Sequence, residues 1–236
     1  MCPQPITGSA SLPDRFQMNN SLSHHKPILT GNIGIDQDQL PDFDAGPIDL
    51  NAWFSPLDDP KPLDLEIGSG KGTFLVQHTP LTPDVNYIGI EYAAAIWRYA
   101  ADRCRRHCLC NVKIVHTEAG SFVRHFVPPG CLRQVHVYFP DPWPKKRHHK
   151  RRLIQDAFLR QLHNCLEPGG LVRIATDHQG YFQWIQEHAL LVEDLYEQQP
   201  FQALSSAQEG ELVGTNFERK YRLEGKPFYA MILRRR

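Results

Sequence analysis

Residues 63–72 read LDLEIGSGKG, an apolar strand that runs directly into a glycine-rich turn, and a helix is expected from near Thr73. Glycines suit such a turn because the chain bends sharply and a ligand can approach the backbone without meeting a Cβ atom. The turn lacks the last glycine of the dinucleotide fingerprint and the Gly-Lys-Ser/Thr of a phosphate loop. We therefore expect a strand, turn and helix that bind a ligand other than a pyrophosphate or triphosphate.

Short apolar runs alternate with longer amphipathic segments along the rest of the chain. Further strands are predicted at residues 87–91, 112–116, 134–139 and 171–176, with helices at 93–106, 150–166 and 181–191. The sequence 167–170, Glu-Pro-Gly-Gly, is expected to end the second of these helices. A short helix at 215–224 and a strand at 227–233 follow. This order predicts an α/β, Rossmann-like, doubly wound sheet that is mostly parallel, with an antiparallel C-terminal strand.

Composition narrows the class of protein. The 236 residues suit one α/β domain, expected over 61–236, after an arm over 1–60 that is rich in Pro, Gly, Asn, Ser and Asp and is expected to be extended or partly disordered. Lys plus Arg and Asp plus Glu both number 26, so binding of nucleic acid requires a local basic patch. No apolar run is long enough to cross a bilayer, and a cytoplasmic protein is expected.

Cysteines and histidines gather at one place, where Cys104, His107, Cys108 and Cys110 follow one another closely. Their spacing matches no zinc pattern, and no second pair follows downstream. The six cysteines are expected to be reduced thiols, and no metal is expected.

Three glutamates fall at the ends of three successive predicted strands. Glu66 stands two residues before Gly68, where a carboxylate can attract the cationic end of a zwitterion such as S-adenosylmethionine. Glu91 lies where acidic residues of nucleoside-binding folds accept from ribose hydroxyls, and Glu118 where a polar group can meet an adenine amino group. Each could instead only solvate a strand end, but ligands of such folds bind at this edge, and we favour a cofactor site that also includes Gly70 and Gly72.

The predicted strand 134–139 leads into Pro-Asp-Pro-Trp-Pro and then into eight residues, 145–152, that are all basic or histidine. The two prolines restrict the backbone around Asp141, and Trp143 offers a stacking face to a purine. A basic run is often a solvated surface, and an aspartate between prolines often caps a turn. Beside a methyl donor, the same segment is a candidate RNA-phosphate contact.

These motifs resemble the bacterial tRNA (guanine-N7-)-methyltransferase family. The resemblance is carried by EIGSGKG at 66–72, FPDPWPKKRH at 139–148, ATD at 175–177 and TNFE at 215–218. It implies S-adenosylmethionine contacts at Glu66, Glu91 and Glu118, where the family usually has aspartate at the last position. It also implies Asp141 as the catalytic residue. The implied tRNA contacts are Asp141, Lys145, Asp177, Thr215, Asn216, Phe217 and Glu218.

The resemblance further implies methylation of a variable-loop guanosine, usually position forty-six, by a monomer or homodimer that binds tRNA. Guanine N7 is unprotonated at neutral pH, so we assign Asp141 to orienting the base and stabilising its developing positive charge, not to general-base chemistry. The arm departs from the family, which often carries arginines there, whereas this chain has SHHKP at 23–27. Help from the arm in binding tRNA is therefore not expected.

Two other kinds of protein share part of this pattern. A methyltransferase of a small molecule or protein would keep the glycine turn and the carboxylates but leaves the basic run unexplained. A non-catalytic RNA-binding relative would bind RNA without methyl transfer. Thr215 and Glu218 also have the Thr-x-x-Glu spacing of a helix capping box, a role that can coexist with binding of the guanine edge.

Overall fold

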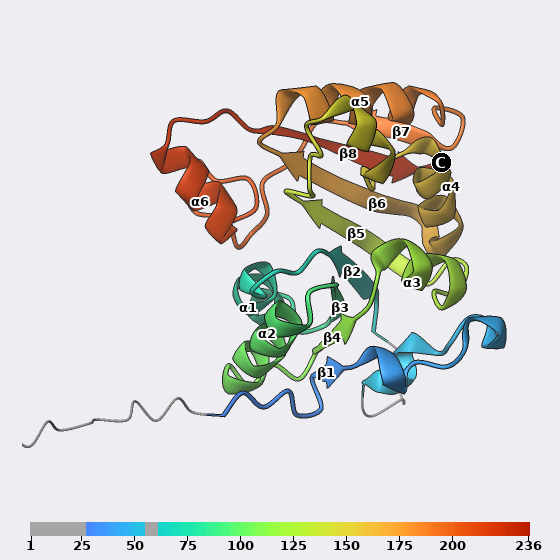
Figure 1. Cartoon of the computed structure of the whole chain (residues 1–236), viewed down its shortest axis with the longest axis vertical. Helices are drawn as coiled ribbons and strands as arrows, with labels where there is room; N and C mark the ends of the chain where they lie inside the picture. Colours follow the sequence, from blue (N-terminus) through green and yellow to red (C-terminus); the bar gives the residue numbers. More distant parts are fainter. Residues whose placement is uncertain (1–26, 55–60) are drawn as a thin grey trace, which may run out of the picture.

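The computed structural model describes residues 27–54 and 61–236, which build one sheet in the order β1-β4-β3-β2-β5-β6-β8-β7 (Figure 1). All pairs are parallel except those of β8, which runs antiparallel to both β6 and β7. The strands are β1 (Gly34–Ile35), β2 (Leu63–Ile67), β3 (Asn86–Glu91), β4 (Val112–His116), β5 (Leu132–Tyr138), β6 (Leu166–Thr176), β7 (Tyr196–Gln199) and β8 (Tyr229–Arg235).

Helices cover both faces of this sheet, which makes it doubly wound as predicted. The α-helices are α1 (Thr73–His78), α2 (Ala94–Arg106), α3 (Ala119–His125), α4 (Asp156–Cys165), α5 (Gln179–Leu190) and α6 (Asn216–Leu223). One core, called the main core below, contains side chains of α3, α4 and α5. The other core contains side chains of α1 and α2 together with residues of the segment before α6. In Figure 1, α6 stands apart from α5 and faces α1 and α2 across the C-terminal edge of the central strands.

The five predicted central strands are confirmed, and three of them begin earlier than predicted. The strand predicted at 87–91 is β3, Asn86–Glu91. The strand predicted at 134–139 is β5, Leu132–Tyr138, and that at 171–176 is β6, Leu166–Thr176. The prediction that 167–170 ends the preceding helix is confirmed, because α4 ends at Cys165 and Gly169 has a positive φ of 78°. These residues belong to the start of β6, which begins directly after α4. The elements β1, β7 and α3, which are short or polar, were not predicted.

The helix predicted at 150–166 starts later than expected. Residues Lys146–Arg151 form a 3-10 helix, η5, and α4 begins only at Asp156. The backbone between them is extended at Arg152 and at Gln155, which precedes the helix. Arg152 is buried and donates from Nε to the carbonyl oxygen of Pro142 at 2.9 Å, so it holds this segment against the loop before it.

Part of the predicted N-terminal arm packs on the domain. Within residues 27–54, β1 pairs with β4, and three 3-10 helices follow: η1 (Gln37–Gln39), η2 (Phe43–Ala45) and η3 (Leu50–Trp53). Leu50 and Phe54 are buried in the main core. Single apolar residues of the arm, which follow neither a helical nor a strand period, thus anchor it to the domain. The domain boundary near residue 60 stays a prediction. The remainder of the arm lies outside the described residues.

None of the helices in the described parts of the chain has both the length and the apolar character that a bilayer crossing requires.

Candidate cofactor and nucleic-acid site

The glycine turn after β2 adopts a backbone that favours glycine at three positions. Gly68, Gly70 and Gly72 have φ angles of +76°, +52° and +67°. A Cβ atom on Gly68 would meet no atom within 4 Å, so it would project into open space above the turn. The turn is fixed from β3, because the amides of Gly68 and Ser69 both donate to the carbonyl oxygen of Ile90 at 2.9 Å. This leaves an open, preformed surface for a ligand, as the sequence predicts.

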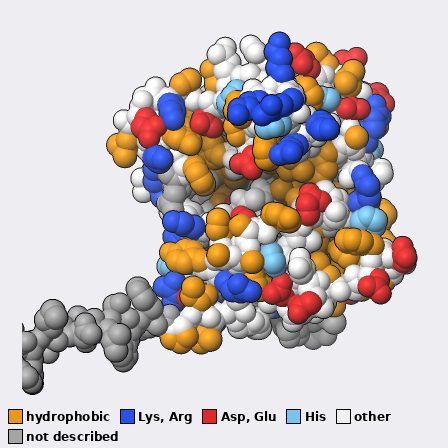
Figure 2. Space-filling model, in the orientation of Figure 1, with side chains coloured by type: hydrophobic (Ala, Val, Ile, Leu, Met, Phe, Trp, Pro, Cys, Tyr) orange, Lys and Arg blue, Asp and Glu red, His pale blue; other side chains and the backbone are white. Residues whose placement is uncertain are grey.

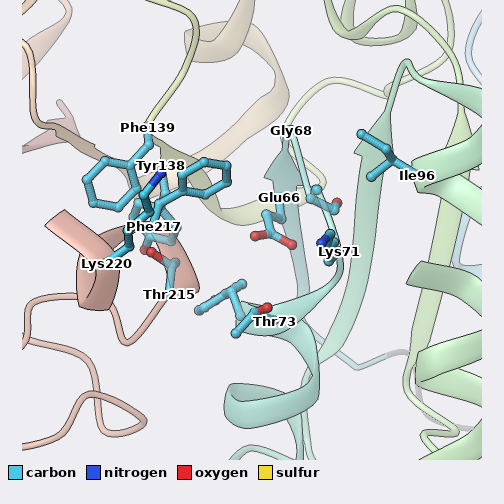
Figure 3. Close-up of a pocket in the computed structure, with 13 residues that line it drawn as sticks. Glu66, Gly68, Lys71, Thr73, Ile96, Tyr138, Phe139, Thr215, Phe217 and Lys220 are labelled. Atoms are coloured by element: carbon cyan, nitrogen blue, oxygen red, sulfur yellow. The ribbon is translucent and has the colours of Figure 1, made fainter. Parts of the chain in front are cut away.

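A cavity of about 320 Å³ lies over this turn. In Figure 3, Glu66 points into it from β2, Lys71 and Ile96 lie on one side, and residues of β5 and the α6 segment lie on the other. Figure 2 shows the corresponding hollow in the face of the molecule, with Lys and Arg side chains gathered above it. The lining residues are Glu66, Gly68, Ser69, Gly70, Lys71, Thr73, Phe74, Ile96, Tyr138, Phe139, Thr215, Phe217 and Lys220.

Glu66 is the buried carboxylate of this cavity, with 4% of its surface exposed. Burial raises the pKa of its carboxyl to about 8; a hydrogen bond from Ser69 opposes the shift and the charge of Glu91 adds to it. Its Oε2 atom is buried without a hydrogen-bond partner among the described residues. A buried carboxylate oxygen without a donor, beside open space, fits a ligand that brings a cationic group.

Glu91 and Glu118 have a different role in the described structure, because both carboxylates accept from backbone amides. Glu91 accepts from Gly70 at 2.9 Å and from Ala93 at 2.8 Å, so it ties the glycine turn to β3. Glu118 caps α3 by accepting from Gly120 at 2.8 Å and Ser121 at 2.7 Å. Neither lines the cavity, and their cofactor contacts stay predictions.

The loop after β5 has a strained backbone. Phe139 and Trp143 have positive φ angles of 54° and 42°, which non-glycine residues rarely adopt. Phe139 lines the cavity, and Asp141, two residues further along, is exposed to solvent. Strain at both ends of Pro-Asp-Pro-Trp indicates that the surrounding contacts hold this loop in one conformation. Asp141 does not itself line the cavity.

The basic segment 145–152 divides into an exposed and a buried part. Lys145, Lys146, Arg147, Lys150 and Arg151 are exposed. Arg152 is instead buried beneath the loop, with its guanidinium over the rings of Tyr181 at 5.0 Å and Trp184 at 5.2 Å. Arg152 therefore supports the loop from inside, and the phosphate contact predicted for this segment stays a prediction for its exposed residues.

The segment at α6 brings two of the predicted substrate residues to the cavity. Thr215 and Phe217 line it, and Phe217 is 55% exposed, with its ring 6.5 Å from that of Phe139. Thr215 also accepts from the Glu218 amide at 3.1 Å and so caps α6. The side chain of Asn216 lies outside the described residues.

Glu218 is buried, and its carboxylate accepts from the amides of Leu212, Val213 and Gly214. Asp177 follows β6 and is partly exposed, without lining the cavity. Of the predicted substrate residues, the cavity thus gathers Thr215 and Phe217. The sequence analysis did not select Tyr138, Phe139, Ile96 or Lys220, although Tyr138 and Phe139 directly precede the Pro-Asp-Pro motif.

No group of three or more His, Cys, Asp or Glu side chains is placed to hold a metal ion within residues 27–54 and 61–236. Cys104 is buried, whereas Cys108 and Cys110 are exposed.

The fold and the cavity over the glycine turn define a class, the Rossmann-like class I methyltransferases. A solved 16S rRNA methyltransferase, KamB, has this fold, with a TM-score of 0.53 at 13% identity over 74% of this chain and 87% of that chain. A family profile described as "Putative methyltransferase" matches residues 60–231. The chain belongs to the tRNA (guanine-N(7)-)-methyltransferase family.

Two relatives of that name illustrate the similarity. One from Thermus thermophilus is 46% identical over 128 residues, which cover 54% of this chain and 41% of that protein. One from Alkalilimnicola ehrlichii is 35% identical over 196 residues, covering 80% of this chain and 78% of that protein. The chain thus spans less than half the length of the first relative and more than three quarters of the second.

Proposed function

We propose that this protein transfers a methyl group from S-adenosylmethionine to N7 of a guanosine in tRNA, usually the variable-loop guanosine forty-six. The observation that supports the proposal is that two residues line the same cavity: the buried Glu66, whose Oε2 has no donor among the described residues, and Phe139, which begins the strained loop on which Asp141 lies. The names of the relatives give the substrate class. The protein acts in the cytoplasm, as a monomer or homodimer, with tRNA as its partner.

S-adenosylmethionine supplies an electrophilic methyl group on a sulfonium. Glu66 attracts the cationic end of this ligand, and the glycine turn lets it approach the backbone. Glu91 acts through the turn by fixing the amide of Gly70, and we retain its predicted ribose contact and the adenine contact of Glu118 within the proposal. These residues bind and orient the donor, which lowers the entropic cost of reaction.

Asp141 orients the guanine and stabilises the positive charge that the purine acquires. The guanine N7 lone pair is free at neutral pH, so no base has to remove a proton. Phe139 and Phe217 offer ring faces at the mouth of the cavity, and Lys145 and its exposed neighbours hold phosphates. Asp177 and residues 215–218 complete the tRNA contacts in the proposal.

The deciding experiment incubates the protein with labelled S-adenosylmethionine and unmodified tRNA and maps the methylated guanosine by strand cleavage at that base. Label at one guanosine supports the proposal. Label only in protein or small metabolites favours another methyltransferase class, and RNA binding without label favours a non-catalytic relative.

A further inference from the structure

One face of the sheet beneath the cavity is polar where the other face of the same strands is apolar. Leu65, Val135, Val137, Val172 and Ile174 are buried in the main core. On the opposite face, neighbouring positions of β2, β5 and β6 carry buried polar side chains: Asp64, Glu66, His136, Tyr138 and Arg173. Burying polar groups lowers stability unless they are paired, so packing alone does not account for this stripe.

Three of these side chains, Asp64, His136 and Tyr138, form one hydrogen-bonded chain that starts at the partly exposed Arg133. Arg133 donates from Nε and Nη2 to the carboxylate of Asp64 at 2.8 and 2.6 Å. Asp64 Oδ2 lies 3.1 Å from His136 Nε2, and His136 Nδ1 lies 2.7 Å from the hydroxyl of Tyr138. The chain therefore runs from Arg133 to the wall of the cavity, which Tyr138 lines.

The chemistry of its members gives this chain one direction. Burial opposes ionisation of Asp64, but hydrogen bonds from His136 and Arg133 keep its pKa below the usual value, so it is a carboxylate that only accepts. Burial lowers the pKa of His136, so its ring is neutral at pH 7. Its proton then sits on Nε2, facing Asp64, and Nδ1 accepts. The hydroxyl of Tyr138 must therefore donate to His136.

This direction determines what Tyr138 presents to its other neighbours. With the proton committed to His136, the phenolic oxygen accepts from the guanidinium of Arg173, so its polar contacts lie within the protein. The ring is what Tyr138 contributes to the cavity wall, and its π face attracts a cation. Tyr138 is 7% exposed and its ring packs edge-on against Phe74 at 5.4 Å. Because Ile67 pairs with Val137, Tyr138 lies level with Gly68, nearer than Glu66 to the edge from which Asp141 extends.

We propose that the ring of Tyr138 is the wall of the cavity that meets the sulfonium of the methyl donor through its π face, and that Arg133, Asp64 and His136 hold the ring in this position through its hydroxyl. The inference rests on the proposed function, because it assigns the donor to this cavity. Glu66 serves the ammonium end, and Tyr138, one step nearer the reacting edge, serves the sulfonium end.

The test compares two ligands that differ in the sulfonium charge, S-adenosylmethionine and S-adenosylhomocysteine, by titration calorimetry. Tyr138→Phe keeps the ring and removes the hydroxyl that holds it. We expect the dissociation constant of S-adenosylmethionine to rise about ten-fold, and that of S-adenosylhomocysteine less than about two-fold. His136→Phe, which leaves the Arg133–Asp64 pair intact, should shift the ratio in the same direction.

The matched control is Tyr196→Phe, since Tyr196 is also buried and its hydroxyl donates to the carbonyl oxygen of Leu159 at 2.7 Å in the other core. It should lower stability in urea without changing either dissociation constant. Unchanged binding in Tyr138→Phe, or equal weakening of both ligands, would overturn the inference. Failure of the unmodified protein to bind S-adenosylmethionine would instead contradict the proposed function.

Discussion

Among single residues, the site depends most on the carboxyl group of Glu66, because its burial makes ionisation unfavourable. Glu66 is buried, and its Oε2 lacks a donor among the described residues. Such a group is retained when a ligand repays the cost of its burial, which is why sites for cationic ligands contain shifted carboxyls. The sequence predicts Glu66 because it stands two residues before Gly68, but the spacing carries no information on burial.

The first prediction concerns the pH dependence of stability of the ligand-free protein. The Glu66 carboxyl keeps its proton up to a pKa of about 8 when folded, whereas the unfolded chain releases it near 4.5. The folded state therefore binds more protons between these values, and stability falls as pH rises through that range. Glu66→Gln removes this loss. The unfolding free energy of the variant minus that of the unmodified protein should therefore grow from pH 5 to 8, by a few kcal/mol in order of magnitude.

Urea unfolding at several pH values measures this difference, with the exposed Glu193→Gln as the control that should follow the unmodified protein. A constant difference between Glu66→Gln and the unmodified protein across pH 5 to 8 would sink the assignment of a raised pKa.

The second prediction concerns Asp141, which is exposed after the strained residue Phe139. Asp141→Asn should lower methyl transfer to tRNA by about a hundred-fold, because the carboxylate stabilises charge on the purine, and should leave unfolding and donor affinity nearly unchanged. Single-turnover kinetics measure the effect, and the exposed Asp84→Asn serves as the control. Near-normal turnover of Asp141→Asn would refute its role.

At the scale of elements, the cavity is closed by a segment that a few side chains hold in place. The carboxylate of Glu218 accepts hydrogen bonds from the three backbone amides of residues 212–214. The guanidinium of Arg219 donates to Glu211 at 2.7 Å and to Gln77 of α1 at 3.3 Å. The predicted Thr-x-x-Glu cap is confirmed for Thr215, which accepts from the Glu218 amide. The carboxylate of Glu218 anchors the preceding loop, so the buried charge serves the structure of the site.

The third prediction follows from those three bonds. Glutamine has one acceptor oxygen, and its amide nitrogen would face backbone N–H groups, so Glu218→Gln should lower the unfolding free energy by about 2 kcal/mol. Methyl transfer should fall with it, because Thr215 and Phe217 lose their positions. Urea unfolding checks the first effect, and Glu209→Gln, exposed in the same segment, should change neither. A Glu218→Gln protein of normal stability would contradict the anchoring role.

The sequence predicts those elements whose pattern is local. Short segments such as 63–67 and 112–116 identify central strands, because apolar residues alternate with or adjoin single polar residues in them and these apolar residues are buried. The edge strand β7, Tyr-Glu-Gln-Gln, has no such run, and α3 has only seven residues. The burial of Arg152 was not predicted, because basic side chains are usually exposed and only tertiary contacts with Tyr181 and Trp184 bury it. The role of Tyr138 was not predicted, because the hydrogen-bonded chain that holds it joins His136 to Asp64, 72 residues earlier in the sequence.

Over the whole molecule, the formal net charge is zero, and the proposed binding of RNA therefore requires basic side chains to gather at one place. Lys and Arg gather above the hollow in Figure 2. Exposed cations of 145–151 lie on the loop that also carries Asp141. Phosphate contacts can therefore position the polynucleotide over the cavity without a basic protein overall.

The fourth prediction is the salt dependence of tRNA binding. Affinity should fall steeply with salt, because bound counterions are released, and Lys145→Gln should reduce the log–log slope by about one. Fluorescence titration over a range of salt concentrations measures the slope. Lys61→Gln, exposed before β2 at the other end of the sheet, is the control and should leave it unchanged. A slope that is identical in Lys145→Gln and the unmodified protein would remove Lys145 from the interface.

The decisive measurement for the proposed site is a crystal structure with bound S-adenosylmethionine. We expect density in the cavity over residues 68–72, with the ammonium group at Glu66 and the methyl group toward the loop of Asp141. Donor density at another site, or in this cavity with the methyl group directed away from that loop, would show that the donor site is wrongly assigned.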